Sequence, residues 1–191
     1  MLISEEYRKL NKQMHVNKKG YGSHGQRWAN HVLSLAKAMK SEDVLDYGCG
    51  KSTLAANMPF DIKQYDPAIE KHSVLPEPAD LLVCTDVLEH IEPACIDDVL
   101  NDIYSLSKKG VFLVIHNGPA VKHLPDGRNA HLIQQNEIWW LGALLPRFEL
   151  LTFTANAGEE HSEEKNVIEY LIAATPRKSF VIKEDQDEKP R

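Results

Sequence analysis

The alternation of short apolar segments with segments of helical periodicity constrains the fold more than any other feature of this sequence. Apolar segments of strand length occupy residues 43–47, 62–65, 81–84, 111–115, 148–154 and 167–174. Helical patterns near 23–39, 51–58, 96–110 and 134–145 stand between most of them, the first opened by a capping box at 23–26. This order predicts an α/β fold with a mostly parallel sheet and helices on both faces. The last two strands follow one another without a helix, so one should run antiparallel at the sheet edge.

The length of 191 residues favours one domain. We predict a basic helical arm at 1–22, the folded domain at 23–175 and a charged, disordered tail at 176–191. The net charge of −6 gives no indication of nucleic-acid binding. Apolar runs fall short of the roughly 18 residues of a membrane span, and the first residues do not form a secretory signal. Three cysteines without C-x-x-C spacing argue against a disulfide framework. These features predict a cytoplasmic protein.

The loop after the first strand, at 46–53, invites three phosphate-binding interpretations. Gly50-Lys51-Ser52 supplies the end of a Walker A loop, but Leu45 stands where the first glycine should be. A dinucleotide fingerprint needs a third glycine where this chain has Thr53. Both motifs fail by one residue, and a lone G-x-G is weak support for either.

Charge discriminates between these ligands better than the glycines do. Asp46 ends the first strand beside the glycine turn, and its carboxylate would repel a pyrophosphate by about 3 kcal/mol at roughly 5 Å and an effective dielectric near 20. The same carboxylate favours a cationic ligand such as S-adenosyl-L-methionine, which carries a sulfonium and an ammonium group. Asp66 lies twenty residues later, at the end of the second strand, where an acid can accept two ribose hydroxyls.

With these residues in place, the sequence resembles the class I S-adenosylmethionine-dependent methyltransferases over about 20–175. Val44-Leu45-Asp46-Tyr47-Gly48-Cys49-Gly50 is similar to their first motif and Tyr65-Asp66 to their second. The stretch 80–91, with its D-V-L-E-H ending, is similar to their fourth. The segments 21–22 and 124–133 resemble a small bacterial and phage subgroup.

The resemblance implies a Rossmann-like, seven-stranded sheet with a terminal antiparallel β-hairpin. It also implies that Gly48 and Gly50 let the backbone approach the methionine part of the cofactor, with Asp46 near its ammonium. Asp66 would hold the ribose, and Thr85 and Asp86 would line the cofactor. Glu89 and His90 are expected to organise the turn that follows. One departure concerns the third strand, because only thirteen residues separate Asp66 from Asp80, too few for the usual helix and full strand.

Two places carry candidate catalytic residues. His116 follows the fourth predicted strand, and its imidazole suits proton transfer near neutral pH. The loop 126–131 gathers Asp126, Arg128 and His131, which suit binding of an acceptor or, alternatively, a surface turn in which Asp126 pairs with Arg128. The histidines of this region lack a recognisable metal-ligand spacing, so no metal site is predicted.

The resulting hypothesis is a methyltransferase that uses S-adenosyl-L-methionine and acts on a small-molecule or nucleotide-related acceptor. Two alternatives stay open: a non-catalytic partner protein that binds the cofactor, suggested by the shortened third-strand region, and a nucleotide-phosphate enzyme, suggested by Lys51. The acceptor and the oligomeric state are not readable from the sequence.

Overall fold

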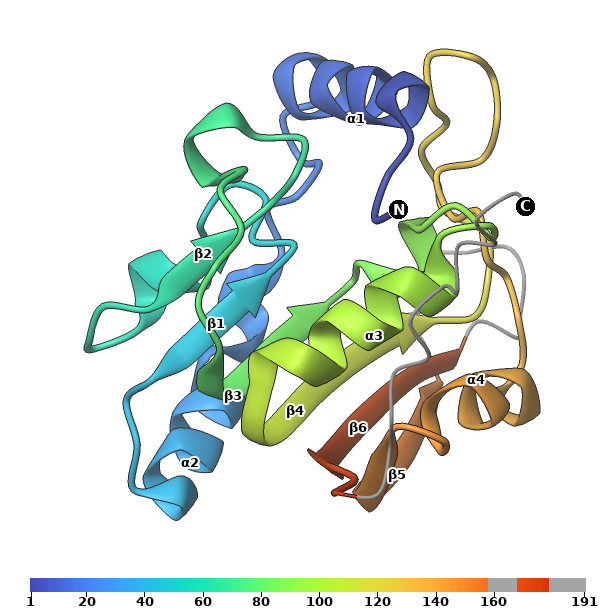
Figure 1. Ribbon diagram of the computed structural model, residues 1–191. Helices are drawn as coiled ribbons and strands as arrows, with labels where there is room; N and C mark the ends of the chain where they lie inside the picture. The colour runs from blue at the N-terminus through green and yellow to red at the C-terminus, as the bar shows by residue number, and fades with distance from the viewer. Residues whose placement is uncertain (158–167, 179–191) are drawn as a thin grey trace, which may run out of the picture.

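Six strands form one sheet in the computed structural model, which describes residues 1–157 and 168–178. The sheet order is β2-β1-β3-β4-β6-β5 (Figure 1). β1, β2, β3 and β4 pair in parallel, whereas β6 runs antiparallel to both of its neighbours, β4 and β5. The α/β class, the mostly parallel sheet and the antiparallel terminal pair are therefore confirmed. The strands are β1 Val44–Tyr47, β2 Lys63–Tyr65, β3 Ala79–Thr85, β4 Ser107–His116, β5 Phe148–Ala157 and β6 Ile168–Pro176.

The seventh strand implied by the family resemblance is not found in the described residues. β2 ends at Tyr65 and β3 begins at Ala79, and the connection between them contains only the short 3-10 helix η3 Glu70–His72. Pro76 and Pro78 follow in this connection and cannot donate ladder hydrogen bonds. β2 is consequently the edge strand of the sheet.

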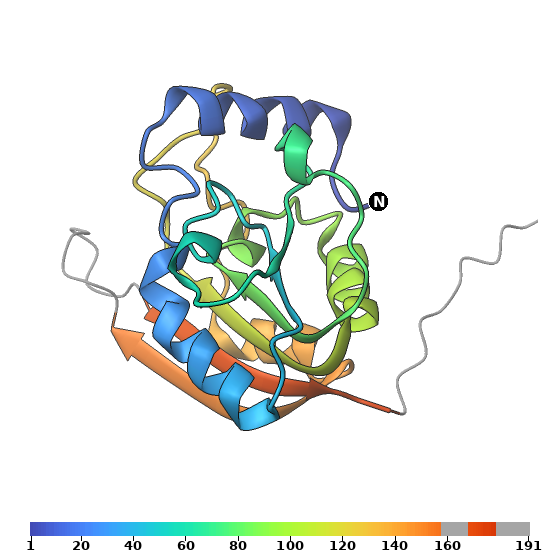
Figure 2. The same cartoon turned by 90° about the vertical axis from the view of Figure 1, so that its left-hand side faces the viewer.

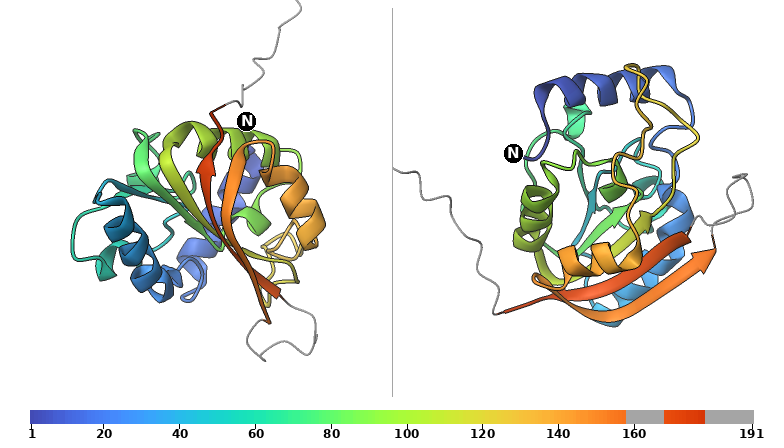
Figure 3. Two further views of the ribbon diagram at one scale, coloured as in Figure 1. Left: turned by 90° about the horizontal axis from the view of Figure 1, so that it is seen from below. Right: turned by 90° about the vertical axis from the view of Figure 1, so that its right-hand side faces the viewer.

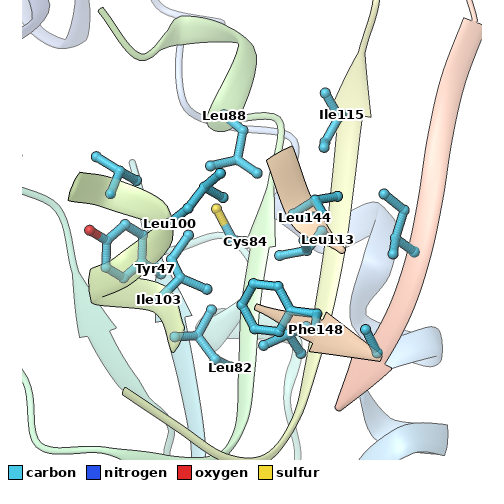
Figure 4. Close-up of a cluster of buried hydrophobic side chains, with 14 of the residues drawn as sticks. Tyr47, Leu82, Cys84, Leu88, Leu100, Ile103, Leu113, Ile115, Leu144 and Phe148 are labelled. Carbon is cyan, nitrogen blue, oxygen red and sulfur yellow. The ribbon is translucent and has the colours of Figure 1, made fainter. Parts of the chain in front are cut away.

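Alternating side chains give the sheet two apolar faces. Leu81 and Val83 of β3 pack with the helix α2 Ala29–Met39, while Leu82 and Cys84 pack on the other face. Helices α3 Ile96–Leu106 and α4 Glu137–Leu144 cover that second face. Figures 2 and 3 show α2 on the opposite side of the sheet from these two helices. Figure 4 shows Cys84 among Leu88, Leu100 and Leu113 in the larger cluster.

Local sequence signals misplaced two helix boundaries. The capping box predicted a helix from Ser23, but a 3-10 helix η1 Gly25–Trp28 comes first and α2 begins at Ala29 without a side-chain cap. The helix predicted to end at 108–110 instead ends at Leu106, and β4 begins at the next residue. Lys108 and Lys109 bind the carboxylates of Asp43 and Asp80 rather than carbonyls at a helix end. The helix predicted from Lys51 is reduced to the 3-10 turn η2 Ala55–Asn57.

The helix α1 Glu5–Asn17 lies across the carboxyl ends of the parallel strands (Figures 1 and 2). Ser4 caps its first turn by accepting a hydrogen bond from the amide of Tyr7. Tyr7 and Met14 pack with Tyr21, Leu124 and Ala130, so α1 and the loop between β4 and α4 form an apolar cluster of their own. Helices of the described residues are all too short or too polar to cross a membrane. Most of the predicted tail, 179–191, lies outside the described residues.

Candidate functional site

A cavity of about 730 Å³ opens where the strands β1 to β4 end, between the sheet and α1. Its volume falls in the range of small-molecule pockets, about 300–1,000 Å³. Parallel pairing of β1 with β2 and β3 sets Asp46 opposite Gln64 and Val83, so the loops that follow these strands meet at one edge. All six residues predicted to bind the cofactor line the cavity: Asp46, Gly48, Gly50, Asp66, Thr85 and Asp86.

The glycine turn after β1 leaves no backbone amide free for a phosphate. The amides of Gly48 and Cys49 donate to the carbonyl of Tyr65, and the amide of Gly50 donates to Oδ2 of Asp66 at 3.1 Å. The amide of Lys51 donates to the carbonyl of Gly22. A phosphate-binding loop needs these N–H groups for its ligand.

Lys51 itself is turned away from the cavity. Its Nζ donates to the carbonyls of Lys18 and Lys19 at 3.0 and 2.8 Å, and the residue does not line the pocket. The lysine on which the phosphate-binding alternative depended is therefore occupied elsewhere.

Close packing explains both glycines of the turn. Gly48 and Gly50 have φ values of +81° and +50°, in the left-handed region that side chains disfavour. A Cβ at Gly48 would lie 2.3 Å from Cγ2 of Val87, and one at Gly50 would lie 2.5 Å from the carbonyl oxygen of Gly22. The turn can therefore approach both the β3 loop and the segment after α1.

Asp46 is the buried carboxyl group of the turn, with an exposed fraction of 4%. Burial, with a further contribution from the nearby charge of Asp66, raises the pKa of Asp46 to about 7. The two oxygens of Asp66 accept bonds from the amides of Gly50 and Ala68. A cation placed between these side chains would favour the ionised form of Asp46.

Acidic side chains outnumber lysine and arginine side chains in the lining. Among the described residues, one arginine (Arg27) and one lysine (Lys122) line the cavity. Arg27 already forms an ion pair with Glu169 at 3.3 Å. The carboxyl groups of the lining are those of Asp46, Asp66, Asp86, Glu89, Glu92 and Glu169. The cavity is thus suited to a cationic ligand.

His116, at the end of β4, lies between two of these acids. Its Nε2 is 3.2 Å from Oε1 of Glu169 and 3.5 Å from Oδ1 of Asp86. The hydrogen bond with Glu169 raises the pKa of His116, although burial opposes this shift. Asp86 has a positive φ of 56°, and burial raises the pKa of its carboxyl group.

His131 also lines the cavity, next to His90 and His116. Its ring centroid is 4.7 Å from that of His90 and 5.9 Å from that of His116. Burial lowers the pKa of His131, and burial together with His131 lowers the pKa of His90 to about 3. Both imidazoles are therefore neutral at neutral pH.

The structure does not bring Asp126 and Arg128 to the cavity. Both are exposed, and Arg128 donates to Oδ2 of Asp126 at 2.8 Å in a tight turn around Gly127. The sequence left two interpretations of this loop open, acceptor binding or a surface turn. Asp126 and Arg128 form the surface turn, because their side chains make an ion pair with each other. Of the four candidate catalytic residues, the cavity receives His116 and His131.

Several lining residues went unnoticed in the sequence. Tyr7 and His15 come from α1, where the Tyr7 hydroxyl donates to the carbonyl of His90 at 2.6 Å and Nε2 of His15 lies 3.8 Å from Asp66. Glu169 comes from β6, and no motif marks either element. Glu89 and His90 were visible in the D-V-L-E-H motif, but the sequence assigned them to the turn. Their proximity to His131 depends on how the loop between β4 and α4 folds, which the motif does not show.

Comparison with known proteins agrees with this geometry. The family model described as "Methyltransferase domain" matches residues 21–162. No curated protein sequence matches the chain. Three similar solved structures share the fold at low identity, and all three contain bound S-adenosylhomocysteine. One of them also contains bound 1,6-didemethyltoxoflavin.

The first is the 1,6-didemethyltoxoflavin-N1-methyltransferase of Burkholderia thailandensis, with TM-score 0.59, 14% identity, and coverage of 90% of this chain and 89% of that one. The second is the N-methyltransferase NodS of Bradyrhizobium japonicum, with TM-score 0.56, 11% identity, and coverage of 89% and 98%. The third is magnesium protoporphyrin IX methyltransferase of Synechocystis, with TM-score 0.52, 16% identity, and coverage of 78% and 82%.

The family model spans well over half of the chain, including β1 to β4 and the cavity they form. The resemblance to class I S-adenosylmethionine-dependent methyltransferases is thereby confirmed at the level of family and fold. The chain belongs to the methyltransferase-domain family.

Proposed function

We propose that this protein transfers a methyl group from S-adenosylmethionine to a small-molecule or nucleotide-related acceptor. The observation that carries the proposal is the acidic cavity at a glycine turn whose amides are all engaged. Such a site repels polyphosphates and attracts a sulfonium and an ammonium group. The structural neighbours with bound S-adenosylhomocysteine support the same cofactor.

The residues present fit this cofactor. The Gly48–Gly50 turn lines the cavity without side chains of its glycines, which would let the methionine part lie close to the backbone, and Asp46 would face its ammonium. Asp66 is positioned to accept from the ribose hydroxyls, and Ala68 offers an apolar wall in the shortened connection after β2. Thr85 and Asp86 line the cavity beyond β3.

The cofactor supplies an activated methyl group, so the protein mainly aligns the acceptor and excludes water. The acceptor lone pair forms the bond to carbon while the sulfur–carbon bond breaks and its electron pair stays on sulfur. Where the acceptor must lose a proton, the neutral form of His116 is the group that would receive it, and Glu169 and Asp86 would stabilise the imidazolium that results.

α1 favours a small acceptor over a polymer. Ser4 binds both carboxylate oxygens of Glu92, and Tyr7 binds the carbonyl of His90, so the helix is fixed across the cavity by hydrogen bonds. A nucleic acid or protein chain that entered the cavity from the side of α1 would have to break these bonds.

Calorimetry with S-adenosylmethionine, S-adenosylhomocysteine and ATP tests the cofactor. We expect the first two to bind and ATP not to bind. Asp46→Asn should weaken S-adenosylmethionine by roughly 10- to 100-fold at pH 8, as expected for a lost charged hydrogen bond of about 1.5–3 kcal/mol. Asp61→Asn removes an exposed carboxylate outside the cavity and should have no effect. Absence of binding by either methionine ligand at millimolar concentration would refute the proposal.

Transfer from labelled S-adenosylmethionine to a cell extract, fractionated by size afterwards, tests catalysis and acceptor class. Label in the small-molecule fraction supports the proposal. Label confined to macromolecules contradicts the acceptor class, and cofactor binding without any transfer favours the non-catalytic alternative.

A further inference from the structure

Glu89, His90 and His131 form a cluster in the cavity lining that the proposed methyl transfer does not use. Each offers one metal-binding atom, and the three atoms all lie within 4.8 Å of one another. Glu89 and His90 belong to the 3-10 helix η4 Leu88–His90 after β3, and His131 comes from the loop between β4 and α4. Two imidazoles and one carboxylate are ligands that Zn²⁺, Mn²⁺, Fe²⁺ and Co²⁺ accept.

Backbone hydrogen bonds fix both histidines in the tautomer that binds metals. Nδ1 of His90 donates to the carbonyl of Ala130 at 2.7 Å, and Nδ1 of His131 donates to the carbonyl of Gly118 at 2.7 Å. A carbonyl only accepts, so each Nδ1 carries the proton and each Nε2 keeps a lone pair. Donation of one ring nitrogen to a carbonyl is the arrangement that orients metal-ligating histidines.

Glu89 supplies an independent observation. It has an exposed fraction of 0%, yet its Oε2 has no hydrogen-bond partner among the described residues. Its Oε1 accepts only a long bond of 3.3 Å from the amide of His116. A buried carboxyl oxygen without a partner is costly and calls for a ligand to explain it.

We propose that Glu89, His90 and His131 bind a divalent transition-metal ion in the cavity. Three electron-pair donors meet there, and a cation would satisfy all of them at once. Ligand atoms about 2.0–2.2 Å from a tetrahedral ion lie roughly 3.3–3.6 Å apart, so the side chains need to close by at most about 1.5 Å, which rotation about side-chain bonds can supply. Three protein ligands leave coordination positions open for an exogenous molecule.

A second group of possible ligands, Asp86, His116 and Glu169, lies beside the first. Here His116 already approaches both carboxylates, at 3.5 and 3.2 Å, so its ring takes the place that an ion would occupy. No ring lies between the ligand atoms of the Glu89 cluster in this way among the described residues. We therefore assign the ion to Glu89, His90 and His131.

The site also points to the chemistry of the acceptor, a consequence that rests on the proposed function. An ion with an open coordination position can bind an oxygen of the acceptor there, and it lowers the pKa of a hydroxyl group that it binds. The acceptor class that fits is a small molecule that presents a hydroxyl oxygen to the metal.

Direct metal binding to the full-length protein tests the site without any assay of activity. Protein freed of metal with a chelator is titrated with Co²⁺ by visible absorption, with Mn²⁺ by electron paramagnetic resonance and with Zn²⁺ by calorimetry. We expect one ion per chain. Glu89→Gln should weaken binding by about 100-fold or more, and His131→Asn by at least about tenfold, the lower bound being the loss typical of a supporting residue.

His123→Asn is the matched control, because His123 is exposed on the same loop and belongs to neither cluster. It should bind the ion like the wild type. Circular dichroism checks the fold of each variant, and His131→Asn decides the matter should Glu89→Gln not fold. Lack of stoichiometric binding by all three ions, or undiminished binding by Glu89→Gln and His131→Asn, overturns the proposal. Loss of binding in His116→Asn alone assigns the ion to the second cluster and also overturns it.

S-adenosylmethionine binding by the metal-free protein separates this proposal from the proposed function. A protein that binds the cofactor and no metal retains the function and loses this site. A protein that binds metal and no cofactor retains the metal site and loses the proposed function.

Discussion

Asp46 couples cofactor binding to protons at the scale of a single residue. Its raised pKa of about 7 means that the carboxyl group is mostly protonated at pH 6. A bound cation favours the ionised form, so binding of S-adenosylmethionine at pH 6 should release a proton. Calorimetry in buffers of different ionisation enthalpy should show this release at pH 6 and its disappearance at pH 8.5. Asp46→Asn should release none at either pH, and an unchanged signal in that variant would assign the proton to another group.

The same shift makes Asp46 a pH-dependent contribution to stability. Because the pKa is higher in the folded than in the unfolded chain, this contribution is fully present below about pH 4 and is lost as pH rises towards 7. Asp46→Asn should therefore stabilise the ligand-free protein at pH 8, by at most about 4 kcal/mol, and much less at pH 4. Urea unfolding of both proteins at the two pH values measures the difference. Equal effects at both pH values would contradict the assignment.

The position of a side chain could be predicted from the sequence where strand ends dictate it, while its role toward the cofactor stays a prediction. Asp46 and Thr85 lie in the last residues of β1 and β3, and Asp66 and Asp86 come directly after β2 and β3. A parallel sheet brings such positions to one edge whatever the rest of the chain does. The loop after β4 offers no such rule. His131 reaches the cavity while Arg128, three residues earlier, pairs locally with Asp126, because the path of the loop depends on its packing with α1.

At the scale of elements, Tyr7 holds α1 against η4, the 3-10 helix that follows β3. Its side chain is buried and its hydroxyl donates to the carbonyl of His90 at 2.6 Å. Tyr7→Phe removes this bond, leaves the carbonyl unsatisfied, and should lower the free energy of unfolding by about 1 kcal/mol. It should also speed amide exchange in α1. Tyr104→Phe, which loses a bond to the carbonyl of Arg177 at 2.8 Å, is the control: it should destabilise without affecting exchange in α1.

The elements themselves were largely visible in the sequence because hydrophobic periodicity sets them. The boundaries of these elements were harder to predict, because the residue at which a helix or strand ends depends on contacts with other parts of the fold. Ser23 is a residue type that commonly caps helices, yet residues 25–28 form a 3-10 helix that buries Trp28 against the sheet. Lys108 and Lys109 are typical of a helix end, yet ion pairs to Asp43 and Asp80 place them in a strand.

The whole molecule consists of a sheet with its two helical layers and a smaller unit above it. That smaller unit is the apolar cluster of Tyr7, Met14, Tyr21, Leu124 and Ala130, which packs separately from the two clusters of the sheet. No single segment of sequence predicts this arrangement, because it joins α1 to a loop more than a hundred residues away. The number of strands, six in the part of the chain that the structure describes, is a global feature too, and the short connection after Asp66 pointed to it.

Because the cavity lies between these two units, ligand binding should change their relative stability. Small peripheral clusters open at lower free energy than a central sheet, so amides of α1 should exchange faster than those of β3 and β4 in the ligand-free protein. S-adenosylhomocysteine at about 100 times its Kd adds about 2.7 kcal/mol, which should slow exchange in α1 by up to roughly 100-fold. Hydrogen-exchange mass spectrometry with and without the ligand makes the comparison. Exchange in α1 as slow as in β3 without ligand would show instead that the two units open together as one.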